Sequence, residues 1–96
     1  MTINIDDLIK LGEGYHLEFK EGIDKSFAKE ACAFANASGG KILLGVTDKG
    51  LKKNIVLDNQ LSSRIQDTIN HIEPRCHATV SQVDGIVCII NVNMTT

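Results

Sequence analysis

The chain has little aromatic character, one proline and no long apolar run. Aromatic residues make up 4% of the 96 residues, so a core has to be built from the aliphatic side chains that supply most of the 43% hydrophobic content. No apolar stretch reaches the roughly 18 residues of a membrane span. The N terminus has no basic segment followed by an apolar one. We therefore expect no membrane partner, no signal peptide and a single packed domain.

Cysteine and positive charge are also scarce. Three widely spaced cysteines, an odd number, favour a reducing compartment, and hence a cytoplasmic protein. A net charge of -2 excludes the strongly basic class of nucleic-acid-binding proteins. Four lysines nevertheless gather around one predicted strand and the turn after it: Lys41, Lys49, Lys52 and Lys53. Such a group can contact a phosphate backbone, although an ordinary solvated loop explains it equally well.

Strand and helix patterns follow one another along the chain. Alternating apolar residues predict a half-buried strand over 15–20, and a helical stripe predicts a helix over 25–37, with Asp24 or Ser26 as its N-cap. Further strands are expected at 42–46, 55–57, 78–83 and 86–92, and a second main helix at 59–72 with Asp58 as its N-cap. This order predicts an α+β fold in which two main helices pack on a mixed sheet of four to five strands.

Residues 33–50 carry the densest local information. The first helix runs into Gly39 and Gly40, which can adopt positive φ and redirect the chain. An apolar strand follows, in which Gly45 allows a close backbone approach or a bulge. Asp48-Lys49-Gly50 then forms a turn sequence. The segment is not a phosphate-binding loop of the Walker type, because Ile42 stands where such a loop needs Ser or Thr.

Several ordered motifs resemble one protein family. They are Glu13-x4-Glu18-Phe19-Lys20, the Ala-Phe-Ala-Asn-Ala-Ser-Gly-Gly run of 33–40, the Leu-Gly-Val-Thr-Asp-Lys-Gly run of 44–50, and Ile-Glu-Pro at 72–74. Together they resemble the Schlafen-type AlbA-like domain over residues 11–92. Similar domains stand at the N terminus of predicted bacterial and archaeal transcriptional regulators and helicase-like proteins. The resemblance implies a DNA- or RNA-binding module, and we expect the 96 residues to be part of a longer protein.

The resemblance leaves two kinds of site open. In a binding module, Lys41, Lys49, Lys52 and Lys53 would contact phosphates, with Lys20 and Lys29 as additions, and no cofactor would be needed. In the Schlafen nucleases, which cut structured RNA, the catalytic carboxylates match Glu13, Glu18 and Asp48 here. Those carboxylates would hold Mg²⁺ or Mn²⁺, while Lys20 would stabilise charge on the phosphate.

Simpler explanations exist for the same residues. Asp48 is also an ordinary turn residue, and Glu18 with Lys20 forms an ordinary same-face ion pair. A third class of function is a protein-interaction or dimerisation domain, which the net negative charge favours. The Schlafen enzyme core resembles two such lobes around one groove, so a homodimer would be needed to supply the second lobe.

Overall fold

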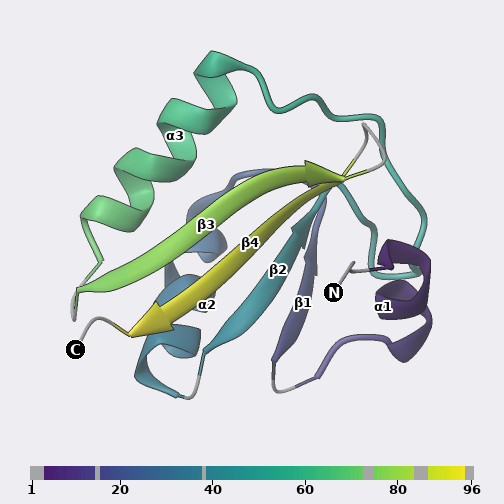
Figure 1. Cartoon of the computed structure of the whole chain (residues 1–96), viewed down its shortest axis with the longest axis horizontal. Helices are drawn as coiled ribbons and strands as arrows, with labels where there is room; N and C mark the ends of the chain where they lie inside the picture. Colours follow the sequence, from purple (N-terminus) through teal and green to yellow (C-terminus); the bar gives the residue numbers. More distant parts are fainter. Residues whose placement is uncertain (1–3, 15, 38, 73–74, 84–86, 95–96) are drawn as a thin grey trace.

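The computed structural model describes residues 4–14, 16–37, 39–72, 75–83 and 87–94. One four-stranded sheet forms the centre of the fold, with strand order β1-β2-β4-β3 (Figure 1). β1 runs parallel to β2, and the other two neighbouring pairs are antiparallel, so the predicted α+β fold with a mixed sheet is confirmed. The elements are α1 (Ile5–Leu11), β1 (Leu17–Lys20), α2 (Lys25–Asn36), β2 (Gly40–Leu44), α3 (Asn59–Asn70), β3 (Cys76–Val83) and β4 (Val87–Met94).

The two faces of the sheet are covered unequally. α2 and α3 pack on one face, where Phe27, Ile65 and Ile90 belong to the larger buried cluster. The short helix α1 lies on the other face, and its Ile5 is buried against a smaller cluster from β1, β2 and β4. In the view of Figure 1, α2 lies behind the sheet, α3 is drawn above β3, and α1 is drawn to the right of β1. No helix in the described part of the chain is long and apolar enough to cross a membrane.

Both main helices begin where the sequence predicts. The Asp24 carboxylate accepts hydrogen bonds from the backbone N–H groups of the first turn of α2, and Asp58 does the same for α3. These caps satisfy donors that have no partner within the helix. The predicted stripe of α2 is buried, with Phe27 and Ala31 fully inaccessible.

β2 lies two residues earlier than the predicted 42–46. Gly45 has a φ of 95°, which takes the chain out of the extended conformation directly after Leu44. A Cβ on Gly45 would stand 2.9 Å from the side chain of Ile55, so this close approach also requires glycine. Gly40 similarly lies against the ring of Phe34.

The segment between β2 and α3 contains no strand, so the fifth strand predicted at 55–57 is wrong. Its backbone is held instead by Gln82 of β3, whose side chain accepts from the Leu57 N–H at 3.2 Å and donates to the Ile55 carbonyl at 3.3 Å. A side-chain amide thus replaces the backbone ladder that a strand would have made. The predicted Asp84-Gly85 turn and Pro74 lie outside the described residues.

Candidate nucleic-acid interface

The face of the sheet that carries α1 is only half covered. Leu43 and Ile89 pair across β2 and β4 beneath α1. Because side chains alternate along a strand, residues two and four positions away point to the same face. Beyond the reach of α1 this face is polar, and we call the following residues the polar sheet face: His16, Lys41, His77, Thr79, Asn91 and Asn93.

The strand register places five of these residues in two rows across the sheet, and His16 joins them as a lining residue of the cavity described next. Lys41 pairs with Asn91, which pairs in turn with Thr79, and Asn93 pairs with His77 one step further along. His77, Thr79 and Asn93 are exposed. The rows lie about 6.8 Å apart, the length of two residues in an antiparallel strand. Backbone pairing therefore fixes the order of these five side chains across the sheet.

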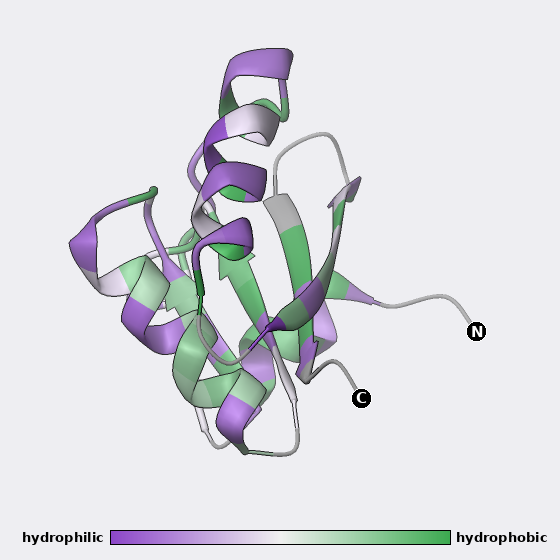
Figure 2. Ribbon diagram, turned by 90° about the vertical axis from the view of Figure 1, so that its left-hand side faces the viewer, coloured by the Kyte–Doolittle hydropathy of each residue, from purple (hydrophilic) through white to green (hydrophobic). Residues whose placement is uncertain are grey.

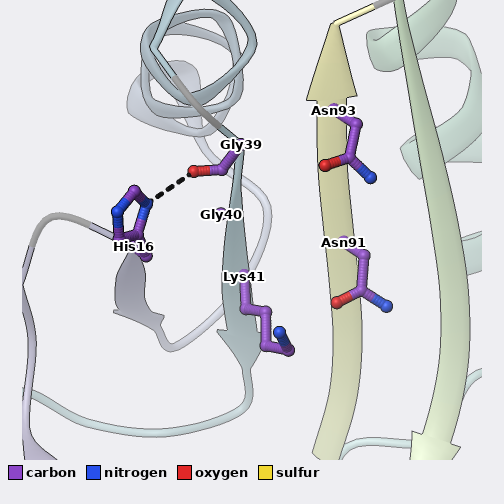
Figure 3. A pocket seen from close by; sticks show the side chains of 6 residues that line it. All are labelled: His16, Gly39, Gly40, Lys41, Asn91 and Asn93. Atoms are coloured by element: carbon purple, nitrogen blue, oxygen red, sulfur yellow. Dashed lines mark hydrogen bonds between the residues drawn. The ribbon is translucent and has the colours of Figure 1, made fainter.

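A cavity of about 420 Å³ opens at one end of the polar sheet face (Figure 3). It is lined by His16, Gly39, Gly40, Lys41, Asn91 and Asn93. Gly39 has a φ of 94°, and a Cβ there would stand 2.6 Å from the Asn93 side-chain oxygen. Any larger residue at position 39 would therefore displace Asn93 and fill part of the cavity.

The imidazole of His16 has a fixed orientation in this cavity. Its Nδ1 lies 2.9 Å from the carbonyl oxygen of Gly39 (Figure 3). A carbonyl oxygen only accepts, so Nδ1 carries the hydrogen and donates. Nε2 is then an acceptor in the neutral ring and a second donor in the protonated ring. Only a protonated His16 can therefore donate from Nε2 to an anion.

The lysines predicted to bind phosphate do not form one cluster. Lys41 lies near the start of β2, on the polar sheet face, whereas the other three follow the end of that strand. Lys52 forms an ion pair with Asp6 at 2.9 Å, and Lys53 pairs with Glu21 at 3.2 Å. Lys41 is thus the one predicted lysine that the structure places with the polar sheet face.

The remaining members of the polar sheet face were missed by the sequence prediction. Asn91 lies in the strand that the sequence predicts at 86–92, and Asn93 lies just beyond that range, in the part of β4 that the prediction leaves out. Two amides spaced two residues apart in one strand indicate that one face is not buried, and that signal was available. Which strands lie beside them depends on the sheet order, which the sequence pattern alone does not specify.

A second group of charged residues lies at the opposite face of β1, beside α2. Burial raises the pKa of the Glu18 carboxyl to about 6, assisted by the charges of Glu13 and Glu30 and by a hydrogen bond with Glu13. Lys20 forms an ion pair with Asp24 at 2.9 Å and lies 3.7 Å from Glu30. Burial acts to lower the pKa of Lys20, but the hydrogen bond to Asp24 and the surrounding carboxylates outweigh it and raise that pKa.

Asp24 shows the reverse effect. Its hydrogen bonds with Lys20 and Ser26, the Lys20 charge and the N–H of Phe27 lower its pKa to about 2. Glu30 has one buried oxygen, Oε2, without a hydrogen-bond partner in the described part of the structure. Lys20 therefore has three acidic neighbours: Asp24, Glu30 and Glu18.

The predicted metal ligands are only partly brought together. Glu13 and Glu30 lie close enough to Glu18 for their charges to raise the pKa of its carboxyl. Asp48 lies in the turn past the end of β2, and Glu13 precedes β1. Because β1 and β2 are parallel, these positions are at opposite ends of the strand pair. Among the described residues, no three acidic, histidine or cysteine side chains form a group able to hold a metal ion, so the arrangement does not fit the predicted site.

Comparison with known proteins gives one family. No curated protein matches the chain. The family model described as "Schlafen, AlbA_2" matches residues 13–96. This range contains the whole sheet, α2 and α3, and every residue of the polar sheet face, and the family suggests a nucleic-acid-binding or related module. The protein therefore belongs to the Schlafen AlbA_2 family.

Proposed function

We propose that this chain is a DNA- or RNA-binding module and that the polar sheet face contacts the sugar–phosphate backbone. One observation carries the proposal: none of the six side chains of that face is a carboxylate, and all of them can donate hydrogen bonds, His16 only when its ring is protonated. The protein as a whole has more acidic than basic residues. The six residues of the polar sheet face thus differ from the protein as a whole, whose net charge is -2, because none of them is acidic.

The distribution of the acidic groups supports this choice. Glu18 and Glu30 gather beside α2, on the other face of the sheet from Lys41 and Asn91. A polyanion approaching the polar sheet face therefore meets Lys41 and uncharged polar side chains, while the sheet separates it from Glu18 and Glu30. Field strength falls with distance and with intervening salt, so this separation reduces repulsion.

The chemistry of the face favours backbone contacts over base stacking. Asn, Thr and His side chains regularly donate to phosphate oxygens, and lysine adds the charge. None of the six residues is an aromatic platform of the Phe, Tyr or Trp type on which bases stack in single-strand binders. We therefore expect modest sequence preference. The salt dependence should be shallow, with a slope corresponding to about one to three neutralised phosphates.

Titrations by fluorescence anisotropy test the proposal. Duplex DNA, single-stranded DNA and RNA are each titrated at 50 and 200 mM salt with the wild type, Lys41→Gln and the matched charge control Lys53→Gln. We expect Lys41→Gln to weaken binding about tenfold and to reduce the salt slope by about one. Lys53→Gln should change little, because Lys53 already pairs with Glu21.

Two results would contradict the proposal. The first is the absence of binding to all three nucleic acids by folded protein at 50 mM salt, which would favour a protein-interaction domain. The second is a larger effect of Lys53→Gln than of Lys41→Gln, which would move the interface to the loop after β2. These measurements use the protein with its three cysteines unchanged.

We further propose that binding needs no cofactor and that the module serves a regulator or helicase-like protein of the cytoplasm. We do not propose cleavage, because Glu13 precedes β1 and Asp48 follows β2, at opposite ends of this parallel strand pair. Repeating the titrations with Mn²⁺ and following substrate length on a gel tests this point. Metal-dependent cleavage that is lost in Glu18→Gln would establish the nuclease alternative instead.

A further inference from the structure

β3 forms one outer edge of the sheet and is unusually regular. All eight of its residues pair with β4, from Cys76 opposite Met94 to Val83 opposite Val87, without a bulge. The outer side of such a strand presents every second backbone N–H and C=O group without a ladder partner. In the described part of the chain, no other backbone segment hydrogen-bonds to β3.

This edge also lacks the charged residues, proline and bulge that usually prevent strands from associating. Proteins protect long edges with charged residues, proline, bulges or a covering element. β3 contains no lysine, arginine, acidic residue or proline, and its exposed side chains are His77, Thr79 and Ser81. Figure 2, drawn from the side on which α3 and β3 lie, shows α3 on one face of the sheet with β3 in view beside it.

The other edge of the sheet provides an internal comparison. β1 has four residues, half the length of β3, and two of them, Glu18 and Lys20, are charged. Lys20 is held by Asp24, the N-cap of α2, and by Glu30 of α2, so this edge is short and charged. The protection that β3 lacks is therefore present at β1 of the same sheet.

We propose that β3 pairs with β3 of a second copy of this chain, in antiparallel orientation, to form a continuous eight-stranded sheet. A strand that pairs with itself about a two-fold axis brings like residues together, so any charge near the axis would repel its own copy. β3 avoids this, because it carries none of the permanently charged residue types. A partner of opposite charge has nothing on this strand to recognise, which makes a second copy the best complement.

The side-chain alternation selects the register. With the two-fold axis at Thr79, Thr79 faces its own copy, His77 faces Ser81 of the second copy, and Ala78 faces Val80 of the second copy. Thr–Thr pairs across antiparallel strands are favourable. Residues directly opposite one another share a face, so exposed polar residues meet polar residues. Ala78 and Val80, which pack against the larger core, extend that core across the axis.

Sedimentation equilibrium without nucleic acid tests the pairing independently of the proposed function. Wild type should show a monomer–dimer equilibrium. Thr79→Lys, at an exposed position, should weaken the dimer at least tenfold by placing two like charges opposite each other. Gln66→Lys introduces the same charge on an exposed position of α3 and should leave the dimer unchanged. Circular dichroism of both variants confirms that the fold is retained.

Hydrogen exchange as a function of protein concentration provides a second measurement that needs no variant. Amides of 76–83 should become more protected as the concentration rises, whereas those of 17–20 should not change. The proposal is overturned if wild type stays monomeric at 0.5 mM, or if Gln66→Lys weakens the dimer as much as Thr79→Lys does. Protection of 76–83 that is independent of concentration would also overturn it, since the edge would then be covered within one chain.

Discussion

The carboxyl group of Glu18 should lower the stability of this protein at neutral pH. Its pKa rises from 4.5 to about 6 on folding, chiefly through burial and then through the charges of Glu13 and Glu30. A group whose pKa is raised in the folded state stabilises the protein fully below its unfolded pKa, and this contribution is lost as the pH rises through the folded pKa. For Glu18 the loss falls between about pH 4.5 and pH 6.

The magnitude follows from the size of the shift. A change from 4.5 to about 6 corresponds to about 2 kcal/mol, and solvent screening of this partly buried side chain reduces it to about 1 kcal/mol. Glu18→Gln keeps the shape of the side chain and removes the charge. At pH 7.5 the variant should therefore be more stable by about 1 kcal/mol, which raises the Tm by about 4–8 °C for a domain of this size.

Thermal unfolding of wild type and variant at pH 4 and pH 7.5 provides the measurement. The gain should be present at pH 7.5 and absent at pH 4, where wild-type Glu18 is itself protonated. Glu21→Gln is the matched control, because Glu21 is exposed and pairs with Lys53, so its loss should be neutral or slightly destabilising. A Glu18→Gln protein that melts below wild type at pH 7.5, or that shows an equal gain at pH 4, would refute the reasoning.

Three further substitutions test the fold by chemical denaturation. Gly45→Ala should lower the free energy of unfolding by about 2–3 kcal/mol, because φ is 95° and the new Cβ would stand 2.9 Å from Ile55. Gly22→Ala is the control, since it has open space around the new Cβ and should be nearly neutral. Equal effects of the two substitutions would contradict the positive φ of Gly45. Asp58→Ala should cost about 1 kcal/mol through loss of the α3 cap, and Asp58→Asn much less; similar losses would show that the cap contributes little. Gln82→Met should cost about 1–2 kcal/mol and speed proteolysis within 52–58, and unchanged proteolysis would mean that other contacts hold this segment.

The helices could be predicted well because their signals are local. Phe27, Ala31 and Phe34 repeat at helical spacing, and a capping aspartate precedes each main helix, so every signal lies within one or two turns of the residues it controls. The end of β2 depends instead on a distant contact. Gly45 leaves the strand where Ile55, ten residues further on, packs against it, and no local pattern specifies that meeting.

The candidate site was predicted less completely, for a related reason. Lys41 and Lys49 are close in sequence, but the strand between them carries them to opposite ends of β2. The family resemblance groups Asp48 with Glu13 and Glu18. In the structure β1 and β2 are parallel, so Glu13, which precedes β1, and Asp48, which follows β2, lie at opposite ends of the strand pair. Asn91 is a neighbour of Lys41 because β4 lies between β2 and β3. This strand order depends on packing across the whole sheet and not on a local sequence pattern.

The position of β4 has a consequence for how this domain is made. β4 is the last strand in the sequence and yet lies inside the sheet, between β2 and β3. A nascent chain that still lacks 87–94 has no ladder partner for the inner edge of either strand, and Ile42 of β2 remains without Ile90, the residue opposite it in the register. The sheet cannot close until that strand leaves the ribosome, so folding should follow synthesis of the complete domain, and chaperones would encounter the exposed strands before that moment.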